Sequence, residues 1–409
     1  MRIDTLPSRA DACARAIVIA LGFSIPISVA LDNILLALLL ASWLASGGYR
    51  DKLAAIKTSP VALAALLLFG LLTVGLAYGI RNPGDGLRYW GKYSDLLFVP
   101  VFITVFRREQ MRENALKALG GALVLSLIVS FIAHTGLLFE NPLVPLNNAD
   151  TPVGFKYSIT HSLLMSFGAF ACLLAARNAA ARATRAALLG LALVAACNVL
   201  FIVFSRTGYV VLAALMLYFF VAQFRWRGLA AAMAVGVLLF GAAYCGSDMF
   251  QQRADRAVSE LHDWQPDAPA ASSVGMRMEF YRTSLNIVRE HPLFGAGTGS
   301  FPAAYAATVA GRQMEETVNP HNEYLLIAIQ IGLTGLACLV GLFSLQWRLA
   351  ARLDPLYRDL ARGLVLMFAI GCMFNSLLLD HTEGLLFAWA SGLLFAGLPP
   401  SAKTAERPA

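Results

Sequence analysis

The chain has 409 residues, of which 58% are apolar and only 14% are charged, and its mean hydropathy is +0.64. Soluble proteins carry about 25% charged residues, so this composition excludes an ordinary soluble enzyme and indicates a polytopic membrane protein. A net charge of +7 would suggest nucleic-acid binding in a soluble protein, but these basic residues lie mostly in short loops between apolar runs. Membrane topology explains their placement, and we expect no nucleic-acid partner.

The apolar runs predict an all-α polytopic membrane protein with about 12 transmembrane helices. The N-terminal run has no small-residue cleavage site followed by a soluble domain, so we expect a retained first span. The first two runs and the last are short and could be tilted or partly re-entrant. The segments long enough, or nearly so, to cross a core of about 30 Å are residues 14–30, 32–46, 59–80, 90–106, 117–138, 157–176, 186–204, 208–224, 228–246, 321–346, 362–380 and 384–398.

Lysine and arginine residues predict the orientation. With the N-terminus inside, 21 of the 32 fall on the inner side, five in short outer segments and six in the long loop that the positive-inside rule discounts. Both termini are therefore expected inside and the long polar loop outside. The chain then divides into residues 1–245 with helices one to nine, 246–320 as an outer loop with two short helices, 321–398 with helices ten to twelve, and 399–409 as an inner tail.

Four cations, Arg88, Lys92, Lys156 and Arg206, lie at outer helix ends against this bias. Snorkelling or pairing with a nearby acid would explain each of them singly. Arg206 differs because it lies in a tight turn, residues 205–208, between two apolar spans and has no acid nearby in the sequence. A cation without a local partner at that depth indicates an anionic ligand.

The long outer loop predicts two helices and a glycine-rich turn. Residues 251–264 form the first helix, and residues 275–290 form a second with Arg282 and Arg289 on the face opposite an apolar stripe. Those arginines could face a cavity or simply be solvated, and the pattern leaves both open. The glycines at 295–299 follow no strand and precede no helix with a lysine, so a tight turn back to the membrane is preferred to a phosphate loop.

The stretch Asn319-Pro320-His321-Asn322-Glu323 joins this loop to the next apolar run. We expect Asn319 to cap a helix whose first residue is Pro320, because proline suits that position. His321 would then lie in the first turn, where the helix dipole favours a neutral imidazole that can accept a proton. The exposed N–H groups of that turn suit a phosphate. The pattern therefore predicts a base beside an anion site.

The other histidines are weaker candidates. His134, His262 and His291 are interpreted as interfacial or surface residues, whereas His161 and Lys156 could reach a shared cavity. His381, in an outer turn, is the main competitor to His321 as a base. No HExxH, Asp-x-Asp or CxxC spacing occurs, so we expect no metal site and no disulfide framework, and we expect arginines to neutralise phosphate charge.

Two motifs resemble a known family. His321-Asn322, nine residues and Gly332-Leu333-Thr334-Gly335 resemble the H-[N/S/Q]-x9-G-x-x-G signature of bacterial O-antigen ligases. Residues 291–297, HPLFGAG, resemble an element shared with O-antigen polymerases and bacterial protein O-oligosaccharyltransferases, and Arg277 resembles an arginine near the start of the family's loop helix. The likeness covers about residues 200–350 by motif. The short segment at 139–156 departs from the polymerase pattern of two sizeable periplasmic loops and favours a ligase.

The resemblance implies a metal-independent, inverting glycosyltransferase at the periplasmic face of a Gram-negative inner membrane. It would transfer O-antigen from undecaprenyl diphosphate to lipid A–core oligosaccharide in lipopolysaccharide biosynthesis, without a cofactor. His321 would be the general base and Arg206 a catalytic cation. The donor diphosphate or other substrate groups would be bound by a wider set of residues: Arg277, Arg282, Arg289, Arg88, Lys156, His161 and Asn322.

Two alternatives remain at this point. One is another member of the same superfamily, a polymerase or a protein O-oligosaccharyltransferase. The other is a transporter or flippase for an anionic lipid-linked solute. A transporter needs charge near the bilayer midplane, and the apolar spans carry few such charges, Asp95 being a doubtful case.

Overall fold

The computed structural model describes residues 6–79, 83–138, 152–246, 248–262, 272–311 and 316–398. Within them the chain is all-helical, with 81% helix and no strand. The predicted tail at 399–409 lies outside the described residues. A 3-10 helix, Tyr93–Leu97 (η1), and a π-helix, Asn198–Ile202 (η2), interrupt the α-helices. The α-helices are Leu6–Ser24 (α1), Val29–Ala45 (α2), Tyr49–Thr58 (α3), Pro60–Gly75 (α4), Pro83–Lys92 (α5), Phe98–Val105 (α6), Glu109–His134 (α7), Ser158–Asn178 (α8), Arg182–Cys197 (α9), Arg206–Phe224 (α10), Trp226–Gly246 (α11), Asp248–His262 (α12), Ser273–Glu290 (α13), Phe301–Val309 (α14), Glu323–Ala350 (α15), Pro355–Gly371 (α16) and His381–Phe395 (α17).

Each of the twelve predicted spans overlaps a helix, but the helices differ in length from the prediction. Six in the described part of the chain are long and apolar enough to cross a membrane: α7, α8, α9 with η2, α10, α11 and α15. The pair α2 and α3, bent by 115°, could make a seventh, and α4 is apolar but has only 16 residues. The chain is therefore a multi-pass helical membrane protein, and twelve spans remain a prediction.

Helix α17 forms the centre of the bundle and is buried from Thr382 to its end. It packs against α6 and α16, and its Trp389 indole donates to the Val18 carbonyl of α1 at 2.8 Å. The same indole meets Phe106 edge-on, with 5.8 Å between ring centroids. Because α17 touches helices from both ends of the chain, it fixes the position of the Asp380–His381 turn that precedes it.

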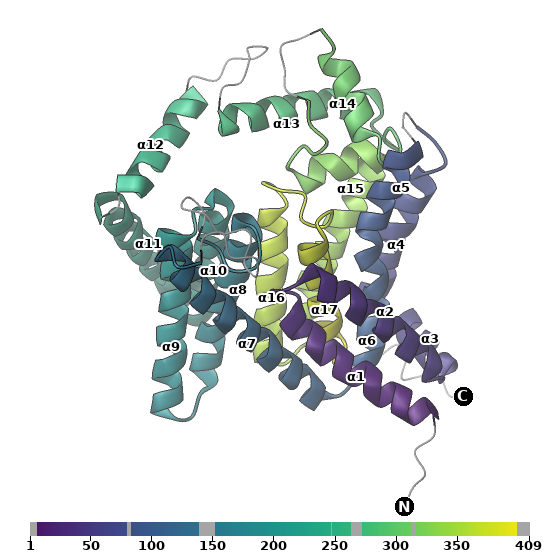
Figure 1. The fold of residues 1–409 in the computed structure, drawn as a ribbon, viewed down its shortest axis with the longest axis horizontal. Helices are drawn as coiled ribbons and strands as arrows, with labels where there is room; N and C mark the ends of the chain where they lie inside the picture. The colour runs from purple at the N-terminus through teal and green to yellow at the C-terminus, as the bar shows by residue number, and fades with distance from the viewer. Residues whose placement is uncertain are drawn as a thin grey trace, which may run out of the picture.

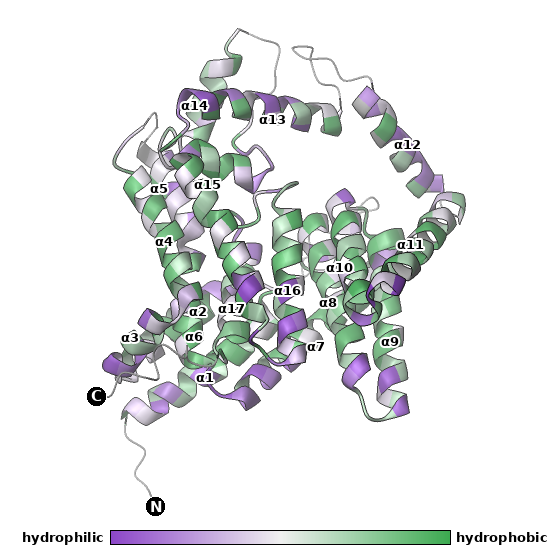
Figure 2. Ribbon diagram, turned by 180° about the vertical axis from the view of Figure 1, so that it is seen from behind, coloured by the Kyte–Doolittle hydropathy of each residue, from purple (hydrophilic) through white to green (hydrophobic). Residues whose placement is uncertain are grey.

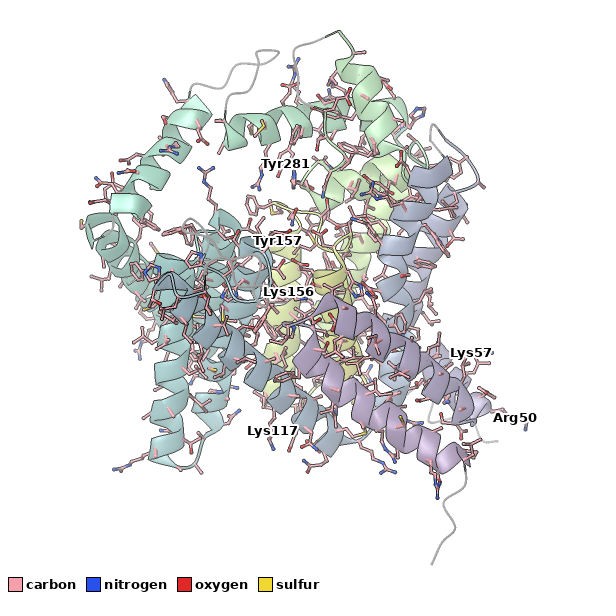
Figure 3. All side chains as sticks on the ribbon, in the orientation of Figure 1. Arg50, Lys57, Lys117, Lys156, Tyr157 and Tyr281 are labelled. Carbon is pink, nitrogen blue, oxygen red and sulfur yellow. The ribbon has the colours of Figure 1, made fainter. Side chains whose placement is uncertain are left out.

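Helices α12, α13 and α14 arch over one end of the bundle (Figure 1). Much of α12 and α13 is hydrophilic, whereas α4, α10 and α16 beneath them are mostly hydrophobic (Figure 2). The cations Arg50, Lys57 and Lys117 lie toward the opposite end (Figure 3). Tyr281 lies on α13 in the arch and Tyr157 lies below it, while Lys156 lies deeper, among the helices of the bundle. The arch therefore covers the end of the bundle opposite Arg50, Lys57 and Lys117, and we call this covered end the α13 end.

Candidate active site

Arg206 is the first residue of α10, and the local sequence explains its position. Ser205 is the N-cap, and its Oγ accepts a hydrogen bond from Gly208 N at 3.2 Å. Gly208 faces Ser162 of α8 so closely that a Cβ would lie 2.5 Å from the serine side chain. This close contact sets the start of α10, and hence Arg206, against the start of α8.

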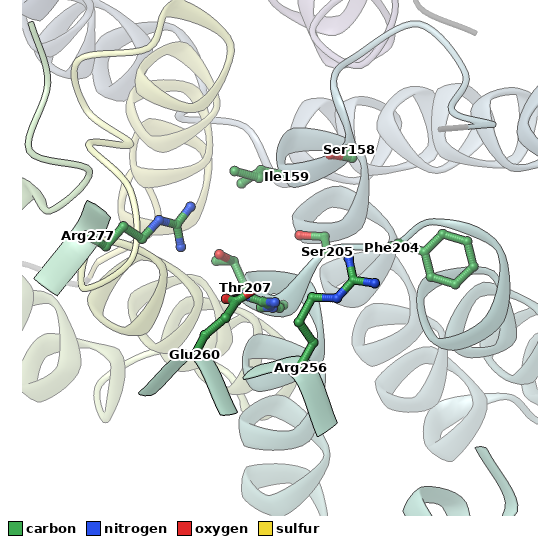
Figure 4. Close-up of a pocket in the computed structure, with 9 residues that line it drawn as sticks. Ser158, Ile159, Phe204, Ser205, Thr207, Arg256, Glu260 and Arg277 are labelled. Carbon is green, nitrogen blue, oxygen red and sulfur yellow. Dashed lines mark hydrogen bonds and ion pairs between the residues drawn. The ribbon is translucent and has the colours of Figure 1, made fainter. Parts of the chain in front are cut away.

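Arg206 has no acid nearby in the sequence, but the fold brings a distant one to it. Arg206 Nη1 lies 3.5 Å from Glu260 Oε2 of α12, which is 54 residues away in the sequence. Both α12 and α13 direct side chains at the start of α10 (Figure 4). The Arg206 side chain remains 39% exposed and that of Glu260 13% exposed, so solvent reaches the arginine and weakens this part-buried pair. Arg206 can therefore exchange Glu260 for an anionic ligand at modest cost.

Arg206 lines a cavity of about 350 Å³ that we call the arginine cavity. It holds three guanidinium groups and one carboxylate, so its charge favours an anion. Burial lowers the pKa of Arg277, and the nearby charge of Arg206 lowers it further. Cations held this close together are stabilised by an anion between them, and guanidinium forks match phosphate oxygens. The lining residues are Ser158, Ile159, Phe204, Ser205, Arg206, Thr207, Arg256, Glu260 and Arg277.

His321 lies outside the helix, contrary to the prediction. The helix α15 begins at Glu323, with Asn322 as its N-cap accepting from Leu325 N at 3.0 Å. Asn319 instead accepts from His321 N at 2.9 Å, which closes an Asx turn around Pro320. The turn leaves His321 in the left-handed region, with φ of +53°. A non-glycine residue in this region is uncommon and is held there by its surroundings.

Three neighbours hold His321. Its Nδ1 lies 3.2 Å from Oδ1 of Asn375, and its ring stacks on Phe280 of α13 with centroids 6.3 Å apart. The Tyr281 hydroxyl holds the backbone of His321 rather than its ring. It donates to the His321 carbonyl, at 3.2 Å, and to the Met373 carbonyl, at 2.8 Å. Because an amide oxygen only accepts, Nδ1 carries the hydrogen and Nε2 of the neutral ring keeps its lone pair.

Burial lowers the pKa of His321, and the Asn375 hydrogen bond opposes this by favouring the charged ring. The charge of Arg277 lowers the pKa, while the Asp380 carboxylate raises it. The net direction is downward, so the imidazole is neutral near pH 7 as expected. Burial rather than the helix dipole is the main cause, since the ring precedes the helix.

Arg277 connects the two parts of the site. Its charge acts both on Arg206, in the arginine cavity, and on the ring of His321. Helix α13 also carries Phe280 and Tyr281, which contact His321 directly. One face of α13 therefore holds a cation of the cavity and a wall of the histidine site.

The glycine-rich segment and α15 form one structural unit. Backbone N–H groups of Ala296 and Gly297 donate to Ile329 and Gln330 at 2.7 and 2.9 Å, and Leu333 N donates to Pro292 O at 2.8 Å. These bonds satisfy carbonyls and amides freed by a break in α15 at residues 331–332. The segment is thus an anchor that returns the arch to the bundle, and its amides are used by protein rather than by phosphate.

Gly332 makes this break possible. Its φ is +68°, and a Cβ there would lie 2.2 Å from the Leu293 carbonyl oxygen. Glycine is the residue that tolerates both the left-handed backbone and so close an approach. The predicted continuous helix at 321–346 is therefore kinked more than two turns after the start of α15 at Glu323, where the motif has its first glycine.

The other candidate residues are placed differently. Arg282 pairs with Glu279 at 3.6 Å, and the exposed Arg289 donates to Asn286 at 2.9 Å. Arg88 is exposed on α5. None of these three lines the arginine cavity. Asn322 donates to Met373 O at 3.0 Å in addition to capping α15.

Lys156 and His161 do not meet in a shared cavity. Lys156 is buried and donates to Thr382 Oγ1 at 3.1 Å, in a second cavity described below. His161 is 1% exposed, and its Nε2 lies 3.0 Å from Asn198 Oδ1 of η2. Among the described residues, no group of three or more His, Cys, Asp or Glu is arranged to hold a metal.

Several site residues gave no signal in the sequence. Glu260 and Arg256 come from the charge-mixed helix α12, and Asn375 comes from the end of an apolar run. Each becomes part of the site only through tertiary contacts. Phe280 belongs to the apolar stripe noted on α13, but nothing local indicated that it would stack on His321.

One comparison with known proteins matches the part of the chain that carries these residues. The model of the family described as O-antigen ligase matches residues 191–340, which span η2, the start of α10, the arch and most of α15. No curated protein matches the chain. The family match, which contains Arg206, Arg277 and His321, supports glycosyltransferase activity of the O-antigen ligase and polymerase kind. The match accordingly assigns the domain at residues 191–340, rather than the whole chain, to the O-antigen ligase superfamily.

Proposed function

We propose that the protein is an O-antigen ligase that transfers the glycan of an undecaprenyl-diphosphate-linked O-antigen to lipid A–core oligosaccharide. The observation that carries the proposal is the arginine cavity. Arg277 of α13 lines this cavity, and its charge also acts on the nearby ring of His321. A lipid diphosphate needs two or more cations at the membrane surface, and glycosyl transfer needs a neutral base beside them. The family match supports the same class of chemistry.

The arginine cavity would hold the diphosphate of the donor. Arg206 and Arg277 would contact its oxygens, and Arg256 would add a third cation at the edge. Charge on the bridging phosphate oxygen grows as the sugar–oxygen bond breaks. Fixed guanidinium groups stabilise that charge without reorganisation, which is the usual origin of rate enhancement at such sites.

His321 would act on the acceptor. The acceptor hydroxyl attacks the anomeric carbon as Nε2 takes the hydroxyl proton, and the bond from that carbon to the diphosphate oxygen breaks. Undecaprenyl diphosphate leaves with the bonding electron pair, and the anomeric configuration inverts. Asn375 would keep the hydrogen on Nδ1, so that Nε2 is the basic atom. The donor's diphosphate bond supplies the driving force, and no metal or nucleotide enters the scheme.

This function requires the α13 end to face the periplasm of a Gram-negative cell. The distribution of lysine and arginine along the chain supports that orientation, with both termini in the cytoplasm and the arch outside. We retain twelve spans in the proposal. Short helices such as α17 would then cross the bilayer buried within the bundle.

The test uses purified protein in nanodiscs with lipid-linked O-antigen and rough lipopolysaccharide, without nucleotide. Ligase activity predicts a lipopolysaccharide carrying the full glycan. A longer lipid-linked glycan instead would indicate a polymerase, glycan on added protein would indicate a protein O-oligosaccharyltransferase, and passage across the bilayer without transfer would indicate a flippase. Arg206→Ala should abolish transfer and weaken donor binding, whereas unchanged donor affinity would limit Arg206 to a role in topology.

A further inference from the structure

A second cavity, of about 550 Å³, adjoins the arginine cavity. Ser158 and Ile159 line both of them, so one short stretch at the start of α8 separates the two spaces. The second cavity lies between this stretch, the turn before α17 and the start of α2. We call it the carboxylate cavity, after Asp380 and Glu383 in its wall.

The two cavities differ in charge. The arginine cavity has three guanidinium groups against one carboxylate, whereas the carboxylate cavity has two carboxylates, one ammonium and one imidazole. A diphosphate would meet repulsion from Asp380 and Glu383 in the second cavity. Carboxylates, hydroxyls and an amide together instead suit a ligand rich in hydroxyl groups, because they offer many acceptors and a few donors at short range.

Buried charges face this cavity. Lys156 is 6% exposed and Glu383 is 4% exposed, yet both belong to its wall. Lys156 gives one of its three N–H donors to Thr382, and Glu383 accepts from the hydroxyl of Thr160. Buried charged groups are held by hydrogen bonds, and a polyhydroxylated ligand supplies further partners for both signs of charge.

Tyr157 adds an aromatic surface at the entrance. Its side chain is highly exposed, at 73%, and it lines the same cavity. A large exposed aromatic at the mouth of a polar cavity is suited to cover the apolar face of a sugar ring. The combination of an aromatic face with carboxylates and hydroxyls thus points to a carbohydrate rather than to a small ion.

The carboxylate cavity reaches His321 through Asn375. This residue lines the cavity and also accepts from Nδ1 of the histidine. A sugar in the cavity therefore lies beside Asn375, and the hydroxyl that reacts must extend past this residue to reach Nε2, the basic nitrogen of the ring. Arg277 and the arginine cavity lie on the side of α13. His321 therefore lies between the two cavities. It can take a proton from the ligand in the carboxylate cavity while the ligand in the arginine cavity supplies the electrophilic carbon.

We propose that the carboxylate cavity binds the terminal sugar of the acceptor glycan, with Tyr157 covering one face of the ring and Glu383 and Lys156 hydrogen-bonding its hydroxyls. This inference rests on the proposed function for the identity of the glycan. The arginine cavity then receives the donor diphosphate, and the anomeric carbon meets the acceptor hydroxyl beside His321. The separation of charge keeps the donor and acceptor in their own spaces.

The experiment measures acceptor and donor recognition separately. Tyr157→Ala removes an exposed side chain, and Glu383→Gln replaces a buried side chain by one of the same size. Because Glu383 is buried, a thermal melt checks that the Glu383→Gln variant is folded. At saturating donor, both should raise KM for rough lipopolysaccharide about tenfold or more. The dissociation constant for undecaprenyl diphosphate should stay within about twofold. Trp226→Ala is the matched control, because Trp226 is 75% exposed and lines neither cavity.

Binding of delipidated core oligosaccharide to His321→Ala protein separates this proposal from the proposed function. If the oligosaccharide binds His321→Ala protein but not the Tyr157→Ala, His321→Ala double variant, the cavity proposal is supported. This holds even if the wild-type protein transfers no glycan, a result that would refute the proposed function alone. Transfer with an unchanged acceptor KM in both cavity variants overturns the cavity proposal and leaves the function standing. A parallel rise in the dissociation constant for undecaprenyl diphosphate would assign the cavity to the donor's lipid diphosphate and also overturn the proposal.

Discussion

Asn375 sets the protonation state of His321 in this account, and its substitution gives opposite effects with two different side chains. In Asn375→Leu the Nδ1–H loses its acceptor at 3.2 Å, which lowers the pKa of His321 further and releases the tautomer. A hydrogen bond to a group that becomes charged is worth about 1.5–3 kcal/mol, so kcat/KM should fall roughly 10- to 150-fold. The acid limb of the pH–rate profile should move to lower pH.

Asn375→Asp should move that limb the other way. A carboxylate at this distance favours the imidazolium, and opposite charges within about 4–6 Å raise a histidine pKa enough to shift the limb up by about one to three pH units. A general base works only when unprotonated, so activity is lost as pH falls through the raised pKa. The wild-type enzyme, whose His321 pKa is below its ordinary value, should remain active at a pH where this variant is inactive.

The assay is transfer of lipid-linked glycan under kcat/KM conditions from about pH 5 to 9, with the same membrane scaffold throughout. Asn286→Leu and Asn286→Asp serve as controls, because Asn286 contacts Arg289 on α13 and lines neither cavity. An acid limb that is identical in wild type and both Asn375 variants would refute His321 as the titrating base.

Three further outcomes follow from the geometry. Gly332→Ala should lower the thermal midpoint in a melt, since strain at φ of +68° costs about 1–3 kcal/mol before the contact with Leu293 is counted; Gly341→Ala, on the same helix with open space at its Cβ, should not, and equal midpoints would mean that the kink is not needed. Glu260→Gln should tighten undecaprenyl diphosphate binding up to about fivefold, because it removes a negative charge that lies 3.5 Å from Arg206 in a pair that solvent reaches on the arginine side; weaker binding in a titration would show instead that Glu260 positions the arginine. Incubation with EDTA should leave the transfer rate unchanged, and a rate restored only by an added divalent cation would require a metal site.

The sequence was most informative about local structure. The lengths of the apolar runs placed each predicted span on a helix. The mixed charge pattern and the amphipathic pattern predicted the ends of α12 and α13 to within a few residues. The glycine-rich segment was correctly preferred as a turn back to the membrane, because it lacked the strand and lysine that a phosphate loop needs. The bond network around α15 supplies the physical reason for that turn.

Local pattern was ambiguous around His321. Asparagine followed by proline suits a helix N-cap and equally an Asx turn, and both use the same amide oxygen to accept a backbone N–H. Asn322, which has the same chemistry, takes the cap, so the histidine falls two residues before the helix. The expected neutrality of the ring was right in direction, but its main cause is burial.

Partners distant in sequence could not be predicted. Glu260 reaches Arg206 across 54 residues, and Asn375 reaches His321 from the segment between α16 and α17, because helix packing brings them together. The break at Gly332 was hidden for a related reason. An apolar run with two glycines predicts a continuous helix. The break becomes apparent only in the structure, where the glycine-rich segment forms hydrogen bonds with the backbone of α15.

Donor binding and transfer, measured together on His321→Ala, test the central claim most directly. The account predicts that undecaprenyl diphosphate binds this variant within about threefold of wild type, because the arginine cavity is intact, while transfer falls by about 10²–10⁴, the range for loss of a general base. Transfer at the wild-type rate would contradict the role of His321, and loss of donor affinity in step with transfer would place the imidazole among the phosphate ligands instead.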